Sequence, residues 1–128
     1  MNTNEHESEL DRIVRQVIGA AYEVSNTLGA GFLEKVYERA MVRELILRGM
    51  RVQSQVKYAI TYKGYCVGDY LADLMVECQI IVELKCSDGF SNEAIAQCIN
   101  YLKASGLRIG LLLNFQKPKL EWKRIIYG

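Results

Sequence analysis

The stretch Ile80-Ile81-Val82-Glu83-Leu84-Lys85 is a run of apolar residues that ends in a carboxylate and an amine two positions apart. Side chains alternate between the two faces of a strand, so Glu83 and Lys85 point to one face and Leu84 to the other. A plain buried strand does not need these charges, because an unpaired buried charge is costly. The stretch therefore predicts a strand with one face in the core and one face available for chemistry.

A second carboxylate, Asp73, lies ten residues before Glu83 in another strand-like run, residues 70–76. The short link Glu77-Cys78-Gln79 separates the two runs and would fold them into a hairpin. We therefore expect this hairpin to bring Asp73 beside Glu83 and Lys85.

Hydrophobic periodicity on either side of the hairpin predicts a single domain over residues 1–128. Apolar residues recur at helical spacing over residues 10–24, after a serine, Ser8, that resembles the first residue of a capping box. Period-two alternation begins near residue 51, with Lys63-Gly64 as the expected turn between antiparallel strands. The full predicted order is a flexible tail over 1–7, helices over 8–28 and 32–48, strands over 51–74 and 80–85, a helix over 91–104, and strands over 107–114 and 120–127.

The second predicted helix carries a carboxylate, Glu34, close to its expected buried stripe. That stripe consists of Leu33, Val36, Tyr37, Ala40, Met41, Leu45 and Ile46. Glu34 lies three residues before Tyr37 and so shares a helix face with it. A carboxylate on an apolar face is explained if it is paired or binds a cation. An equally good explanation is a first-turn acid that faces water and is favoured by the helix dipole.

The charges divide the chain into three parts, although its formal net charge is only +1. Residues 12–60 carry eight Lys or Arg against four Asp or Glu, residues 61–102 carry two against six, and residues 103–128 carry six against one. An acidic middle that holds a cation between basic surfaces would suit a polyanion such as nucleic acid. Solvated charge without a partner is the other explanation for this distribution.

Cysteine spacing and hydropathy argue against a zinc or iron–sulfur protein and against a membrane protein. The four cysteines contain no C-x-x-C pair, which argues against a zinc or iron–sulfur knuckle. Every apolar run is soon interrupted by charge, and the first eleven residues are polar and acidic, unlike a signal peptide. We therefore expect no membrane segment and a location in the cytoplasm.

Two carboxylates that converge from adjacent strands repel each other unless a divalent cation lies between them. Oxygen ligands favour a hard ion, and Mg²⁺ or Mn²⁺ would keep several waters and share oxygens with a substrate phosphate. Lys85 would then orient or help activate a water, or neutralise charge that develops on the phosphate. Glu34 could add a ligand or hold a metal-bound water, and the main-chain carbonyl of Leu84 could complete the coordination. The expected reaction is phosphodiester hydrolysis, whereas Glu83 and Lys85 alone are more typical of an ordinary charged pair on a sheet face.

Four motifs, taken together and in order, resemble a known family. They are GFLEKVY at residues 31–37, Ala72-Asp73-Leu74, Val82-Glu83-Leu84-Lys85, and QCINYLK at residues 97–103. This series resembles the GxxExxY proteins of the PD-(D/E)xK nuclease-like superfamily, and the resemblance extends over residues 13–127. Ala72 stands where the superfamily name has proline, a position that carries no ligand.

The resemblance implies an α/β fold with a restriction-endonuclease-like core, in which helices flank a mixed central sheet and two helices precede it. It also implies that Asp73 and Glu83 are metal ligands and that Lys85 is the catalytic lysine. Glu34 matches the family's helix glutamate. The implied cofactor is Mg²⁺ or Mn²⁺.

The resemblance further implies a substrate-binding helix. Gln97 and Tyr101 lie four residues apart, on one helix face, and match a Q-x-x-x-Y helix of RecB-like nucleases that positions DNA or active-site groups. Without the other motifs, such a polar pair is more typical of packing at the boundary of the core. Tyr37 is a further expected substrate contact.

Two functions follow from these observations. The first is a metal-dependent nuclease acting on DNA or RNA. The alternative is a non-catalytic nucleic-acid- or protein-binding module that keeps the nuclease fold. A homodimer joined at a sheet edge is a third, weaker expectation.

Overall fold

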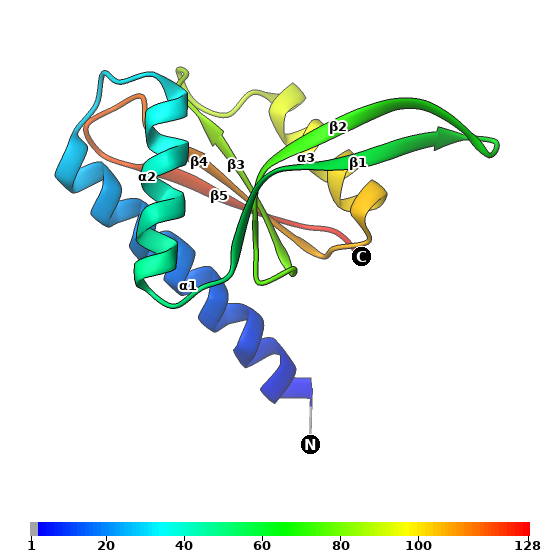
Figure 1. Ribbon diagram of the computed structural model, residues 1–128, viewed down its shortest axis with the longest axis horizontal. Coiled ribbons are helices and arrows are strands. Elements are labelled where there is room, and N and C mark those ends of the chain that lie inside the picture. The colour runs from blue at the N-terminus through cyan, green and yellow to red at the C-terminus, as the bar shows by residue number, and fades with distance from the viewer. Residues whose placement is uncertain (1–2) are drawn as a thin grey trace.

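The computed structural model describes the backbone of residues 3–128 and the side chains of residues 9–128. Helices and strands follow one another in the order predicted from the sequence (Figure 1). Their bounds are α1 Thr3–Leu28, α2 Glu34–Leu47, β1 Val52–Tyr62, β2 Tyr65–Val76, β3 Ile80–Lys85, α3 Asn92–Ser105, β4 Ile109–Asn114 and β5 Glu121–Ile126. The sequence therefore predicts each of these elements, with differences at their ends.

The start of α1 differs from the prediction. This helix begins at Thr3, five residues before Ser8. The expected tail over residues 1–7 is thus helical from residue 3 onward, because residues before Ser8 include Glu5 and Glu7, which are good helix formers. Residues 1 and 2 lie outside the described residues, and so does the Ser8 side chain with its predicted capping box.

The five strands form one mixed sheet in the order β1-β2-β3-β4-β5. β3 and β4 run parallel, with Glu83 opposite Leu112, and the other neighbouring pairs are antiparallel. A parallel pair needs a crossover connection, which α3 supplies. The strand predicted to combine core and chemistry is therefore the central strand of the sheet.

Helices cover both faces of the sheet and create two separate hydrophobic clusters (Figure 1). On one face, α1 and α2 pack through residues such as Val17 and Tyr37 against Leu84 of β3. On the other face, α3 packs through Cys98 against Ile81. Because side chains alternate along β3, Glu83 lies on the same face as Ile81, under α3.

The β1–β2 hairpin changes the face that it presents to the core partway along its length. Leu74 belongs to the cluster under α1 and α2, whereas Ala72, two residues earlier, belongs to the cluster under α3. The change occurs at Asp73, across from Gln55, whose φ of 54° lies in the left-handed region. Uninterrupted alternation along these strands, as predicted, is therefore wrong at this point. Beyond it, the outer part of the hairpin extends past α3 (Figure 1).

The buried stripe of α2 is narrower than predicted. Three of its predicted members are fully buried, namely Tyr37, Met41 and Leu45. Three others are exposed, namely Leu33, Val36 and Ile46. Leu33 is the N-cap residue, outside the helix proper, and α2 packs against α1 and the sheet along the line of the buried three. A charged residue, Glu38, is buried beside this line, which periodicity does not predict.

Helix α3 is fixed at its ends and along its packed side. The sequence allows either Ser91 or Asn92 to cap this helix, and the Ser91 hydroxyl does so by accepting a hydrogen bond from the Ala94 N–H at 3.0 Å. The sequence also predicts that a glycine, Gly106, ends the helix, and its φ of 76° confirms this. A Cβ at Gly110 of β4 would lie 2.5 Å from the Cys98 sulfur, so α3 sits directly on the sheet here. This close packing sets the position of the neighbouring Gln97.

In the part of the chain that the structure describes, no helix combines the length and the apolar character needed to cross a bilayer.

Candidate functional site

Asp73 and Glu83 meet where β2 and β3 diverge. The antiparallel register pairs Leu74 with Val82, and one further step along the same register sets Asp73 opposite Glu83. Instead of continuing the ladder, the Asp73 carboxylate accepts a hydrogen bond from the Leu84 N–H, with Oδ2 and N 2.8 Å apart. The predicted juxtaposition of these two acids is confirmed, and a main-chain donor fixes the orientation of one of them.

Glu83 is the more deeply buried of the two acids. Only 6% of its surface is exposed, and its Oε1 atom has no hydrogen-bond partner among the described residues. Burial, reinforced by the neighbouring charge of Asp73, raises the pKa of the Glu83 carboxyl to about 9. Without a cation, Glu83 therefore holds a proton at neutral pH, and a cation bound there would displace it.

Glu34 is the first residue of α2 and lies close enough to Asp73 and Lys85 for their charges to act on its carboxyl group. Partial burial, and then the charge of Asp73, raises the pKa of its carboxyl, while Lys85 acts in the opposite direction. In the described part of the chain, however, no three Asp, Glu, His or Cys side chains are grouped so that they could together hold a metal ion. The predicted set of three carboxylate ligands is thus not assembled among the described residues.

The residues present fit a hard divalent cation held by two carboxylates. The unpartnered Glu83 Oε1 is a buried acceptor that a cation would satisfy, and the adjacent Asp73 supplies a second oxygen donor. Mg²⁺ commonly binds through one or two carboxylates and keeps several waters, so a third carboxylate is not required. Leu84, whose main-chain carbonyl was a predicted ligand, is tied to the site through its N–H group.

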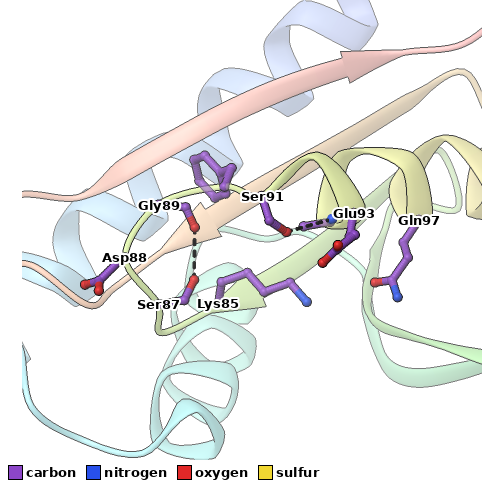
Figure 2. A pocket seen from close by; sticks show the side chains of 9 residues that line it. Lys85, Ser87, Asp88, Gly89, Ser91, Glu93 and Gln97 are labelled. Atoms are coloured by element: carbon purple, nitrogen blue, oxygen red, sulfur yellow. Dashed lines mark hydrogen bonds between the residues drawn. The ribbon is translucent and has the colours of Figure 1, made fainter.

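Lys85 borders a pocket of about 520 Å³ that opens between the end of β3 and the start of α3. Figure 2 shows its side chain reaching toward the α3 side of this pocket, where Glu93 and Gln97 lie. Ser91, the N-cap of α3, lines the same pocket. The predicted catalytic lysine therefore borders an open pocket and lies close enough to Glu83 for its charge to act on that carboxyl group.

A second pocket, of about 680 Å³, lies between α3 and the outer part of the β1–β2 hairpin. Gln97 lines both pockets, so the two spaces adjoin along one side of α3. Tyr101 lines the second pocket and stacks on Tyr70, with ring centroids 3.4 Å apart, and Tyr58 stacks on the other face of Tyr70 at 5.5 Å. Burial, and then the charge of Glu83, raises the pKa of the Tyr101 hydroxyl. Gln97 and Tyr101, the predicted pair on α3, therefore line a groove that consists of these two adjoining pockets.

Tyr37 does not lie in this groove. Its side chain is fully buried, stacks on Phe115 with ring centroids 4.7 Å apart, and donates a hydrogen bond to the Gly29 carbonyl at 2.6 Å. The same hydroxyl accepts a hydrogen bond from the Phe32 N–H at 3.2 Å. The predicted substrate contact by Tyr37 is therefore wrong, because this residue instead holds the loop that precedes Glu34.

Three residues near the site are missing from the sequence-based prediction. Glu38 lies one helical turn after Glu34, a spacing that could have identified it. Tyr70 follows the alternation of the outer hairpin, but nothing in the pattern indicates that its hydroxyl is buried without a partner. Gln55 carries no sequence signal at all, since its role depends on a strand irregularity.

Comparisons with known proteins agree with this geometry. The family model described as PD-(D/E)XK nuclease superfamily matches residues 11–125, so the chain belongs to this superfamily. No curated protein gives a significant match. Among solved structures, one titled "Crystal structure of SSO0001" is similar, with a TM-score of 0.52 and 16% sequence identity. That similarity covers 73% of this chain and 50% of the other, and it supports the restriction-endonuclease-like α/β fold.

Proposed function

We propose that this member of the PD-(D/E)XK nuclease superfamily is a metal-dependent nuclease that hydrolyses phosphodiester bonds of DNA or RNA. The observation that carries the proposal is the pairing of half-buried Asp73 with buried Glu83. One Glu83 oxygen has no hydrogen-bond partner among the described residues, and Lys85, which borders a pocket, is close enough for its charge to act on this carboxyl group. A carboxyl group kept unsatisfied in a protein interior costs stability, which favours a functional explanation.

The proposed mechanism assigns a separate task to each of these side chains. When bound between the two acids, Mg²⁺ or Mn²⁺ would lower the pKa of the attacking water and polarise the scissile phosphate. The Leu84 N–H orients the Asp73 carboxylate, and Asp73 and Glu83 would hold the cation once the Glu83 carboxyl has lost its proton. Lys85 orients the water and stabilises the negative charge that develops on the phosphate. Glu34 would hold a water.

The groove along α3 is the proposed path of the substrate. Gln97 lies at the junction of its two pockets and can donate or accept hydrogen bonds through its amide. Tyr101 offers an aromatic ring, on which a base can stack, and Lys103 a positive charge for the phosphate backbone. We infer that a nucleic acid lies along α3 with one phosphate at Lys85.

The proposed location is the cytoplasm. All four cysteines are free, and two of them, Cys66 and Cys78, are exposed. Exposed free thiols suit a reducing compartment, where disulfides are rare.

A cleavage assay tests the proposal directly. The purified chain, with Mn²⁺ or Mg²⁺, should cut at least one of four end-labelled substrates: single- or double-stranded DNA or RNA. The Asp73→Asn variant keeps the shape of the side chain but loses its charge, so its rate should fall at least about a hundredfold with an unchanged circular dichroism spectrum. Lys119→Ala, an exposed lysine before β5, is the matched surface control and should cut normally.

Cleavage that survives Asp73→Asn at an undiminished rate would contradict the proposal. Saturable, salt-sensitive binding without any cleavage, unchanged by Glu83→Ala, would instead support the non-catalytic binding module.

A further inference from the structure

Glu38 is a buried carboxylate that the proposed reaction does not use. Only 7% of its surface is exposed, yet both of its oxygens have partners. Oε1 accepts a hydrogen bond from Gln55 Nε2 at 2.8 Å, and Oε2 lies 3.1 Å from Lys35 Nζ. Burying a carboxylate is costly unless it is paired. The two partners at these distances satisfy both Glu38 oxygens and so fix the position of the side chain.

Gln55 occupies the point where the β1–β2 hairpin changes face. The register pairs Ser54 with Leu74 and Val56 with Ala72, which leaves Gln55 across from Asp73. Its φ of 54° is uncommon for a residue other than glycine, and such conformations persist where the surroundings hold them. The hydrogen bond to Glu38 supplies such a constraint.

Glu38 also lies one turn from Glu34 on α2. The N-cap residue of α2, Leu33, makes no side-chain capping bond, so the first turn of this helix is held by contacts further along. The bond between Glu38 and Gln55 joins this turn to the strand position that faces Asp73. Asp73 in turn accepts the hydrogen bond of Leu84 on β3. These two hydrogen bonds therefore meet at one register position of the β1–β2 hairpin, which lies between α2 and the central strand.

We propose that Glu38 and Gln55 are a positioning pair that sets the place of Asp73 relative to Glu83 and Glu34, and so the geometry of the metal site. This inference rests on the proposed function. Neither side chain reaches the reacting atoms, so both act through Asp73. Loss of the pair does not remove Asp73 or Glu83. It lets the β1–β2 hairpin shift at the point where it changes face, and Asp73 shifts with it.

Two substitutions of Gln55 and one matched control test the pair. Gln55→Asn removes one methylene, so the amide no longer reaches Glu38, while asparagine tolerates the left-handed backbone better than most residues. Gln55→Ala removes the amide altogether. The control is Gln53→Ala, an exposed glutamine two residues earlier on the same strand. Mn²⁺ affinity is measured by isothermal titration calorimetry on the full chain, and the Leu84 amide is followed by NMR in the metal-free protein.

Both Gln55 variants should bind Mn²⁺ at least about tenfold more weakly than the wild type, which is the usual effect of losing a residue that supports a metal ligand. They should also shift the Leu84 amide resonance, because Asp73 accepts its hydrogen bond. Gln53→Ala should change neither quantity. Glu38→Gln, which retains an acceptor oxygen for Gln55, should stay closer to the wild type than Glu38→Ala. The double variant Glu38→Ala/Gln55→Ala should bind no more weakly than the weaker single variant.

Two results would overturn the inference. One is a Gln55→Asn variant whose Mn²⁺ affinity and Leu84 resonance match those of Gln53→Ala. The other is a Gln55→Ala variant that melts at a lower temperature but binds Mn²⁺ as tightly as the wild type, since the pair would then only stabilise the fold. A wild-type chain that binds Mn²⁺ and loses affinity on these substitutions, but cuts no substrate, would support the pair and contradict only the proposed function.

Discussion

The two faces of β3 are built from alternate residues of one strand, yet they differ in how their polar atoms are satisfied. On the face under α1 and α2, Val82 and Leu84 are at most 1% exposed in an apolar cluster, and the nearby Tyr37 hydroxyl is hydrogen-bonded. On the face under α3, a Glu83 oxygen and the Tyr70 hydroxyl are buried without a hydrogen-bond partner in the part of the chain that the structure describes.

One face of this six-residue strand therefore contributes to stability and the other carries the residues proposed for chemistry. A buried polar group without a partner costs about 1–3 kcal/mol, so the α3 face is destabilising where it holds Glu83 and Tyr70. The opposite face offsets that cost by close apolar packing. Substitutions on the two faces should therefore affect different properties, and the following predictions test this from the largest expected effect to the smallest.

Substituting Lys85 should have the largest effect, and on activity alone. Lys85→Ala should lower the rate of nucleic-acid cleavage by about a hundredfold or more, because it removes a group that stabilises charge in the transition state. The melting temperature should change little, since Lys85 is partly exposed and makes no ion pair among the described residues. Initial rates and thermal unfolding of the same preparation are the two measurements. A large loss of stability with full activity would reverse the assignment of the faces.

The adjacent residue, Leu84, should show the opposite behaviour. Leu84→Ala leaves a cavity in the cluster under α1 and α2 and should lower the free energy of unfolding by about 2–5 kcal/mol. Residual activity per folded molecule should stay within a few-fold of the wild type, because the N–H that binds Asp73 belongs to the main chain. Urea unfolding measures the first quantity. Destabilisation below 1 kcal/mol would show that this face is not the close-packed one.

Glu83 should make the metal-free protein less stable as the pH rises. Its pKa is raised from the ordinary 4.5 to about 9, so the folded state keeps a proton that the unfolded chain loses between these values. The free energy of unfolding should accordingly fall from pH 5 to pH 9, with a slope on the order of 1 kcal/mol per pH unit from this group. Glu83→Gln should remove that part of the slope, and Glu9→Gln, an exposed acid of α1, should not. Identical slopes for the two variants would contradict the assignment.

Removing the Tyr37 hydroxyl should destabilise the protein, whereas removing the Tyr70 hydroxyl should not. Tyr37→Phe removes a hydroxyl that bonds Gly29 and Phe32, and should destabilise the protein by about 1–2 kcal/mol. Tyr70→Phe removes a buried hydroxyl that has no hydrogen-bond partner among residues 9–128, and should leave stability unchanged or raise it by up to about 1 kcal/mol. Chemical denaturation of both variants provides the comparison. Equal destabilisation by the two changes would mean that the Tyr70 hydroxyl is satisfied in solution.

The sequence predicts the fold well where local patterns decide it. The link Glu77-Cys78-Gln79 is short enough to allow only a hairpin, so the meeting of Asp73 and Glu83 follows from counting residues. The cap at Ser91 and the end at Gly106 follow from side-chain chemistry and from the left-handed conformation that glycine tolerates.

The remaining features depend on tertiary packing, which no local pattern records. The change of face at Asp73 requires the unusual backbone of Gln55, and period-two alternation runs through that point unchanged in the sequence. Tyr37 belongs to a motif that suggests a site role, but its ring is needed in the core against Phe115. Glu34 lies near Asp73 but does not form a group of three metal-binding side chains with Asp73 and Glu83 among the described residues. The distance between α2 and β3 is set by the packing of the whole domain.

The central claim is that Asp73 and Glu83 hold a divalent cation between them. Crystals grown with Mn²⁺ and measured at the manganese absorption edge test it most directly, because anomalous scattering locates the ion without ambiguity. We predict a peak in contact with both carboxylates, which disappears in crystals of Asp73→Asn. A peak elsewhere, or fully loaded crystals in which Glu83 keeps no contact with Mn²⁺, would contradict the claim.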